Sequence, residues 1–243
     1  MISSLATLHR KYGIFDEFPI CRNDWLPVMI EAFKEHEDLG YLHSYYVDYF
    51  EQYRELPAES SNSGELTGVA RTVDLQFIGK NVVKTKKSKY FIVFEGSLAD
   101  VAEPSMTVLS CLWATDDPSL QADIMRRFWP GKGKSSYDFI VECLSMTPEV
   151  ASDVFVTDAV RIANSSGKPA LKMNRDLLHR EISILNPEYV VLLGSTAKNV
   201  YGKVSSELDY EVVELPFPTK NYRSAEKIQS TLDEYARFRE LAY

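Results

Sequence analysis

The stretch LNPEYVVLLGSTAKNV, residues 185–200, reads as the end of a helix, a buried strand, a glycine turn and the start of another helix. The run EYVVLLG is short and mostly apolar, as expected of a buried strand. The Asn-Pro pair in front of it stops the preceding helix, because the residue before proline is disfavoured in the helical region. Gly194 either holds a ligand at the start of the next helix or only turns the chain.

Strands and helices alternate on both sides of this stretch. Asn174 is expected to cap the helix that ends at Leu185, and Ser195 to cap the helix that follows Gly194. Strands are predicted at 72–78, 89–96, 106–114, 153–160, 188–194 and 210–216, and further helices at 136–146 and 224–243. Such alternation predicts a layered α/β domain with a largely parallel sheet.

The N-terminal part of the chain differs from the rest in composition. Residues 1–60 hold 5 Lys/Arg and 11 Asp/Glu, a net charge of −6 out of −8 for the whole chain. Two aromatic-rich helices, at 24–40 and 41–57, are predicted to form a hairpin. The sequence therefore predicts an acidic helical extension over 1–58, a linker at 59–68 and an α/β domain over 69–243. The acidic helices are a candidate surface for a protein partner.

Several classes of protein are disfavoured by the composition. The three cysteines form no CxxC pair and no Cys/His cluster at metal-ligand spacing, so neither a metal site nor another cofactor is expected. No run of about 18 apolar residues suggests a membrane span. A cytoplasmic (or nuclear) location is therefore the expectation.

The segments after the predicted strands are the first candidates for a binding site, because ligands of open α/β sheets bind beyond the carboxyl ends of the strands. Taken in order, YFIVFEGSLAD, VFVTDAVR, HREISILNPEYVVLLGSTAKNVYG and LPFPTKNYRS resemble the motifs of the uracil-DNA glycosylase superfamily, over about residues 88–225. The resemblance implies a three-layer α/β/α sandwich and a DNA glycosylase. It also implies that Gly194 belongs to the scaffold.

The resemblance places Asp158 where the family has the asparagine that reads the base. A carboxylate only accepts hydrogen bonds, so Asp158 suits a base with an exocyclic amine, such as cytosine, better than the carbonyl O4 of uracil. Alternatively, Asp158 braces its own loop toward Asn164. Both readings remain open from the sequence.

The loop that should activate water departs from the family pattern. It contains Glu95, Gly96, Ser97 and Asp100, and neither register of its glycine brings an acid or amide to the expected position. Glu95 or Asp100 would then replace that group, unless both are ordinary solvated carboxylates.

The loop after the last predicted strand departs further from the family pattern, because Phe217 stands where the family's His-Pro-Ser begins. Phenylalanine cannot donate the hydrogen bond that stabilises a departing base. The polar residues that follow could still hold a phosphate or could form a solvated turn; they are Thr219, Lys220, Asn221 and Arg223.

Nucleic-acid contacts are suggested by three further features. Trp113 is either a stacking platform for a flipped base or a core residue. The loop at 125–136 interleaves basic and aromatic residues, and Lys80–Lys89 is a basic run. DNA, as a single strand or with a flipped base, is the expected partner.

Two functions follow from the sequence. The first is a divergent DNA glycosylase that recognises or excises a modified or deaminated base by hydrolysing its N-glycosidic bond. The second is a glycosylase fold without catalysis, which acts as a binding or regulatory module through protein or nucleic-acid contacts.

Overall fold

The computed structural model describes residues 2–12, 52, 55–56, 77–78, 89–94, 117–122, 135–145, 147, 150, 153–162, 168–202, 209–219 and 223–242. The predicted helix at 24–40, the linker and the predicted strand at 106–114 lie outside these residues. Of the predicted helix at 41–57, only residues 52, 55 and 56 are described.

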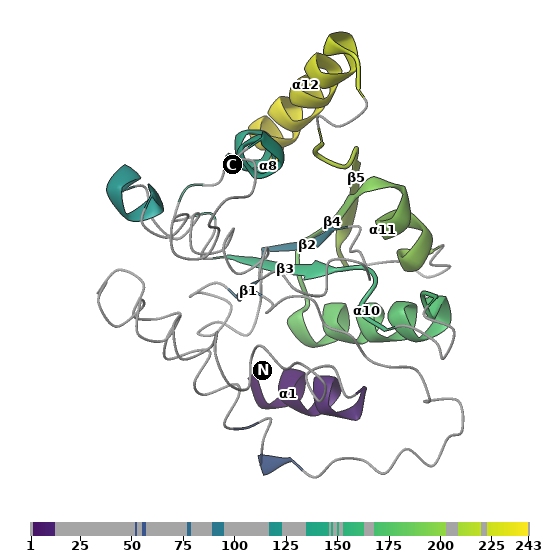
Figure 1. Ribbon diagram of the computed structural model, residues 1–243. Helices are drawn as coiled ribbons and strands as arrows, with labels where there is room; N and C mark the ends of the chain where they lie inside the picture. Colours follow the sequence, from purple (N-terminus) through teal and green to yellow (C-terminus); the bar gives the residue numbers. More distant parts are fainter. Residues whose placement is uncertain are drawn as a thin grey trace.

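The described chain forms a five-stranded sheet and flanking helices (Figure 1). The elements are α1 (Ile2–Lys11), β1 (Phe77–Ile78), β2 (Tyr90–Phe94), α8 (Ser135–Leu144), β3 (Val154–Asp158), α10 (Leu171–Leu185), β4 (Tyr189–Leu193), α11 (Gly194–Tyr201), β5 (Glu211–Leu215) and α12 (Ala225–Ala242). The strand order is β1-β3-β2-β4-β5, with β1 antiparallel and the other four parallel. The prediction of a largely parallel α/β sheet is confirmed.

The strand order explains which helices cover which face. The chain steps from β2 outward to β3 and then crosses back over β2 to β4, and right-handed crossovers put the connecting helices of these two steps on opposite faces. Figure 1 accordingly shows α8 with α12 on one side of the sheet and α10 on the other. The helix α11 contacts α10, and α1 packs against α10 as well. The three-layer sandwich is therefore confirmed.

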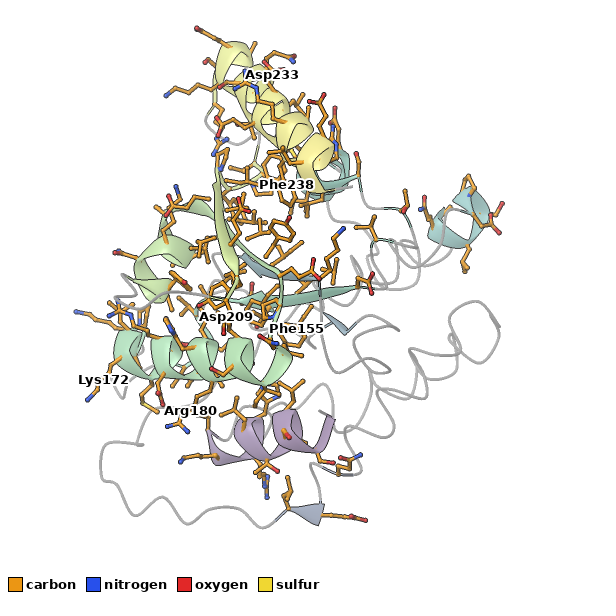
Figure 2. All side chains as sticks on the ribbon, turned by 180° about the vertical axis from the view of Figure 1, so that it is seen from behind. Phe155, Lys172, Arg180, Asp209, Asp233 and Phe238 are labelled. Carbon is orange, nitrogen blue, oxygen red and sulfur yellow. The ribbon has the colours of Figure 1, made fainter. Side chains whose placement is uncertain are left out.

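The core lies on both faces of the central strands. All five residues of β3 are buried, and the rings of Phe91 on β2 and Phe155 on β3 stack with their centroids 4.9 Å apart. In Figure 2, Lys172 on α10 and Asp233 on α12 extend away from the sheet on opposite sides. Burial on both faces is the reason that the inner strands are almost wholly apolar.

Of the three helix boundaries near the quoted stretch, one is as predicted and two differ. The predicted stop is confirmed, because Asn186 takes a left-handed conformation with φ 45° and its N–H donates to the carbonyl of Ile182. Asn174 does not cap α10, which begins three residues earlier, at Leu171. Ser195 does not cap α11 either, since that helix begins at Gly194, whose φ of 91° suits glycine.

Candidate functional site

The carboxyl edge of the parallel sheet is the candidate site. Phe94 at the end of β2 is the register partner of Asp158 at the end of β3. The chain that leaves β2 toward residue 95 therefore starts beside Asp158. The reversal of strand order lies between β2 and β4, and this switch point is where open α/β sheets bind ligands.

Asp158 is well covered by the protein. It is 9 % exposed, and Ala159, Val160, Arg161 and Ile162 after it are buried too. The strand therefore continues into a packed turn, which we call the 158–162 turn. Only a small part of Asp158 is therefore open to solvent.

Asn174 holds the far end of the 158–162 turn from α10. Its Oδ1 accepts the backbone N–H groups of Arg161 at 2.7 Å and Ile162 at 2.9 Å. Its Nδ2 donates to the carbonyl oxygens of Ile162 at 2.8 Å and Ala170 at 3.0 Å. All four hydrogen bonds that an amide side chain can make are formed, which explains why this polar residue is buried inside a helix.

A buried charge network lies next to this amide. Arg161 donates to Glu181 on α10 through both terminal nitrogens, Nη1 to Oε1 at 2.6 Å and Nη2 to Oε2 at 2.5 Å. Nε2 of His9 on α1 lies 2.6 Å from the same Oε1. The side chains of Glu181, His9 and Arg161 are only 0 %, 1 % and 3 % exposed. The network connects three segments that are distant in the sequence.

The charge states of this network follow from its contacts. Burial alone would raise the pKa of Glu181, but the positive charge of Arg161 and the hydrogen bonds from His9 and Arg161 outweigh it and hold the pKa at about 2. Burial lowers the pKa of His9, and its hydrogen bond to Glu181 only partly opposes this. At neutral pH His9 is therefore uncharged and donates from Nε2 to an ionised Glu181.

The loop after β5 is anchored by α12. The Tyr235 hydroxyl donates to the carbonyl of Pro216 at 2.8 Å, and the N–H of Thr219 donates to the carbonyl of Phe217 at 2.9 Å. Arg223 donates from Nη1 to the hydroxyl of Thr231 at 2.7 Å. One of the five donors of Arg223 is therefore engaged with α12.

The structure places part of the predicted site. Asp158 lies at the end of β3, while Thr219 and Arg223 follow β5, three strands away, which corresponds to about 14 Å at the usual strand spacing. The remaining predicted residues lie outside the described residues: Glu95, Gly96, Ser97, Asp100, Trp113, Asn164, Lys220 and Asn221.

The residues that hold the 158–162 turn could not be identified from the sequence. The sequence predicts Asn174 as a helix cap and indicates no functional role for Glu181 or His9. One signal was available, because Glu181 falls on the same helical face as Ile182 and Leu185, where an unpaired carboxylate would be costly. The identity of its partners could not be read from that pattern.

The described residues contain no group of three His, Cys, Asp or Glu side chains arranged to bind a metal ion. No helix in the described part of the chain is both long and apolar enough to cross a membrane.

Comparison with known protein families gives one match. The family model of the Uracil DNA glycosylase superfamily matches residues 112–241, more than half of the 243-residue chain. The matched region contains β3, β4 and β5 with the segments that follow them. No curated protein matches the chain at a significant level.

Proposed function

The chain belongs to the uracil DNA glycosylase superfamily, and we propose that it is a divergent DNA glycosylase that reads an altered base with Asp158. One observation carries the proposal: the pairing of Phe94 with Asp158 brings the start of the segment 95–100 beside the base-reading position. A base held by Asp158 would therefore lie near the point where the chain leaves β2 toward Glu95 and Asp100, the candidates for activating water.

The chemistry of Asp158 points to a class of base. An ionised carboxylate accepts hydrogen bonds, so it pairs with an exocyclic amine and repels the carbonyl oxygen O4 of uracil. Cytosine and its modified forms carry such an amine. The protein would therefore release an amine-bearing pyrimidine in preference to uracil.

Base release is a hydrolysis. The C1′–N bond of the flipped nucleotide breaks and its electron pair leaves with the base, while the oxygen of water bonds to C1′. The proton of that water passes to Glu95 or Asp100 and finally to the base. The loop after β5, with Thr219 and Arg223, would hold the phosphate at the other end of the sheet edge.

One observation favours a second function, a glycosylase fold that binds without catalysis. Phe217 stands where the family's histidine donates to the charged base, and losing one such donor costs about 3 kcal/mol of transition-state stabilisation. The module would then act through DNA, or through a protein partner at the helices predicted in the acidic N-terminal part of the sequence.

The experiment is a base-release assay with single- and double-stranded oligonucleotides that carry uracil, cytosine or modified cytosines. We expect alkali-labile abasic sites with an amine-bearing pyrimidine, and loss of that activity in Asp158→Ala. Asp158→Asn should shift the preference toward uracil, because an amide can also donate. Asp233→Asn, the same change on an exposed position of α12, is the matched control.

The possible results separate the two functions. Full activity in Asp158→Ala would remove Asp158 from base reading. No release from any substrate, together with a gel shift on DNA, would favour binding without catalysis. No release and no shift would direct the search to a protein partner.

A further inference from the structure

The 158–162 turn is held mainly by side chains that reach it from elsewhere. Beyond Asp158 the ladder of β2 and β3 has ended, and α10 supplies the contacts through Asn174 and Glu181. The path of the chain that follows Asp158 therefore depends on how Arg161, three residues along, is held.

Arg161 depends in turn on the orientation of one carboxylate. Its two terminal nitrogens bind the two oxygens of Glu181, whereas its Nε has no hydrogen-bond partner among the described residues. A planar guanidinium and a planar carboxylate that share two hydrogen bonds must stay coplanar. A rotation of the Glu181 carboxylate would therefore move Arg161.

His9 is the third donor to that carboxylate. Its Nε2 and Nη1 of Arg161 both bind Oε1 of Glu181, each at 2.6 Å. The carboxylate is fully buried, so losing the His9 donor removes one of the hydrogen bonds that compensate for its removal from water. His9 thus supports the orientation of Glu181 from a segment 172 residues away in the sequence.

The helix that carries His9 is docked by more than this contact. Leu5, Ala6 and Leu8 are buried, and the hydroxyl of Tyr12 donates to Asp176 on α10. Figure 1 shows α1 alongside α10. Tyr12 lies one residue beyond α1, and its hydrogen bond is to Asp176 of α10 rather than to Arg161 or Glu181.

From these contacts we infer that α1 is a positioning element for the base-reading turn and that His9 is the positioning residue through which it acts, an inference that rests on the proposed function at Asp158. The order of contacts is His9, Glu181, Arg161 and then the 158–162 turn. Movement of α1 away from α10 would therefore loosen the turn and weaken base recognition.

The test compares two amide variants at position 9. Gln can place a donor near the position of Nε2, whereas Asn is too short to do so. We expect His9→Asn to raise the native-state hydrogen exchange of the Arg161 and Ile162 amides, which donate to Asn174, by about tenfold. His9→Gln should leave their exchange near that of the unchanged protein.

Tyr12→Phe is the matched control, because it removes one polar contact with α10 at another place, just beyond the end of α1. Unchanged exchange of the two amides in this variant, together with faster exchange in His9→Asn, supports the inference. Equal acceleration in both variants would mean a general loosening of α1 and would overturn it, as would no change in His9→Asn. If His9→Asn does not fold, His9→Phe keeps the ring volume and serves in its place.

Base release in the same variants distinguishes this inference from the proposed function. In an active protein, His9→Asn should raise KM for the altered base more than it lowers kcat, and His9→Gln should restore KM. If the unchanged protein releases no base but the exchange result holds, the coupling from α1 to the turn stands and the glycosylase proposal fails. If base release occurs and exchange is unaffected, the coupling fails and the glycosylase proposal stands.

Discussion

Glu181 on α10 binds Arg161 through two nearly equal hydrogen bonds of 2.6 and 2.5 Å, in a position where both side chains are almost completely buried. Two opposite charges removed from water stabilise each other only while the pair is intact. Arg161 also lies three residues after Asp158, the candidate base-reading residue. Variants of this ion pair therefore report both on the stability of the protein and on the geometry of the candidate site.

Neutralising one member of this pair should be strongly destabilising. Glu181→Gln leaves the charge of Arg161 buried without its counter-charge, and we expect the free energy of unfolding to fall by about 3–5 kcal/mol. Urea denaturation at pH 7 measures this change. Glu240→Gln on the exposed side of α12 is the control and should leave the urea midpoint nearly unchanged. A midpoint for Glu181→Gln that equals the control would contradict a buried, fully paired carboxylate.

Stability should fall in acid in two steps. The pKa of His9 is lower in the folded protein than the usual 6.5, so as the pH falls through 6.5 the unfolded state takes up a proton that the folded state does not, and stability decreases. Glu181 has a folded pKa of about 2 against an ordinary 4.5, so stability decreases again as the pH falls from 4.5 toward 2.

His9→Gln isolates the first of these steps. It removes the titrating ring and keeps a donor for Glu181, so the loss of stability between pH 7 and 5.5 should become shallower while the loss below pH 4.5 persists. Urea midpoints measured across this range, with the unchanged protein in parallel, provide the comparison. An identical slope between pH 7 and 5.5 in both proteins would argue against a neutral, buried His9.

The side-chain amide of Asn174 should contribute more to the free energy of unfolding than a single hydrogen bond does. Asn174→Ala removes four hydrogen bonds and leaves buried N–H and carbonyl groups of Arg161, Ile162 and Ala170 without this partner. We expect the free energy of unfolding to fall by about 2–4 kcal/mol. Ser183→Ala, on the exposed side of the same helix, is the control for thermal unfolding. A similar melting temperature for both variants would show that Asn174 does not secure the turn.

Gly202 should tolerate no larger side chain. Its φ of +72° and ψ of −169° lie in a region that essentially only glycine adopts and that costs another residue about 1–3 kcal/mol, and a Cβ there would lie 2.8 Å from the guanidinium of Arg175. That guanidinium donates to the carbonyl oxygens of Asn199 and Val200 at the end of α11. Gly202→Ala should therefore lower the melting temperature both through its backbone and by displacing Arg175.

A double-mutant cycle separates these two causes. Gly202→Ala in an Arg175→Ala background retains the backbone strain but loses the collision, so its effect should be smaller than in the unchanged protein. Equal effects in the two backgrounds would mean that the arginine moves aside without cost.

The order of elements could be predicted from the sequence because it depends on local patterns. The apolar run at 189–193 forms β4, the Asn186–Pro187 pair ends α10, and the last strand and helix lie within a residue or two of their expected bounds. The predicted strand at 153–160 contains β3, which ends two residues earlier, at Asp158. Each of these features is decided by residues close together in the chain.

The start of α10 could not be predicted in the same way. Asn174 is a residue type that caps helices, and its local sequence does not distinguish a cap from an interior position. Its actual place is decided by the backbone groups of Arg161 and Ile162, which only the folded chain brings to it. The packing of α1 against α10 could likewise not be predicted, because it joins segments that are distant in the sequence.

The sequence by itself determined a largely parallel α/β sheet, since strand, turn and helix patterns act over a few residues, and its resemblance to the glycosylase family pointed to Asp158. Only the tertiary structure decided that Glu181 is buried and ionised, that Arg161 neutralises it and that His9 of α1 completes the network. A buried carboxylate is stable only with partners in space, and one of these lies 172 residues away along the chain.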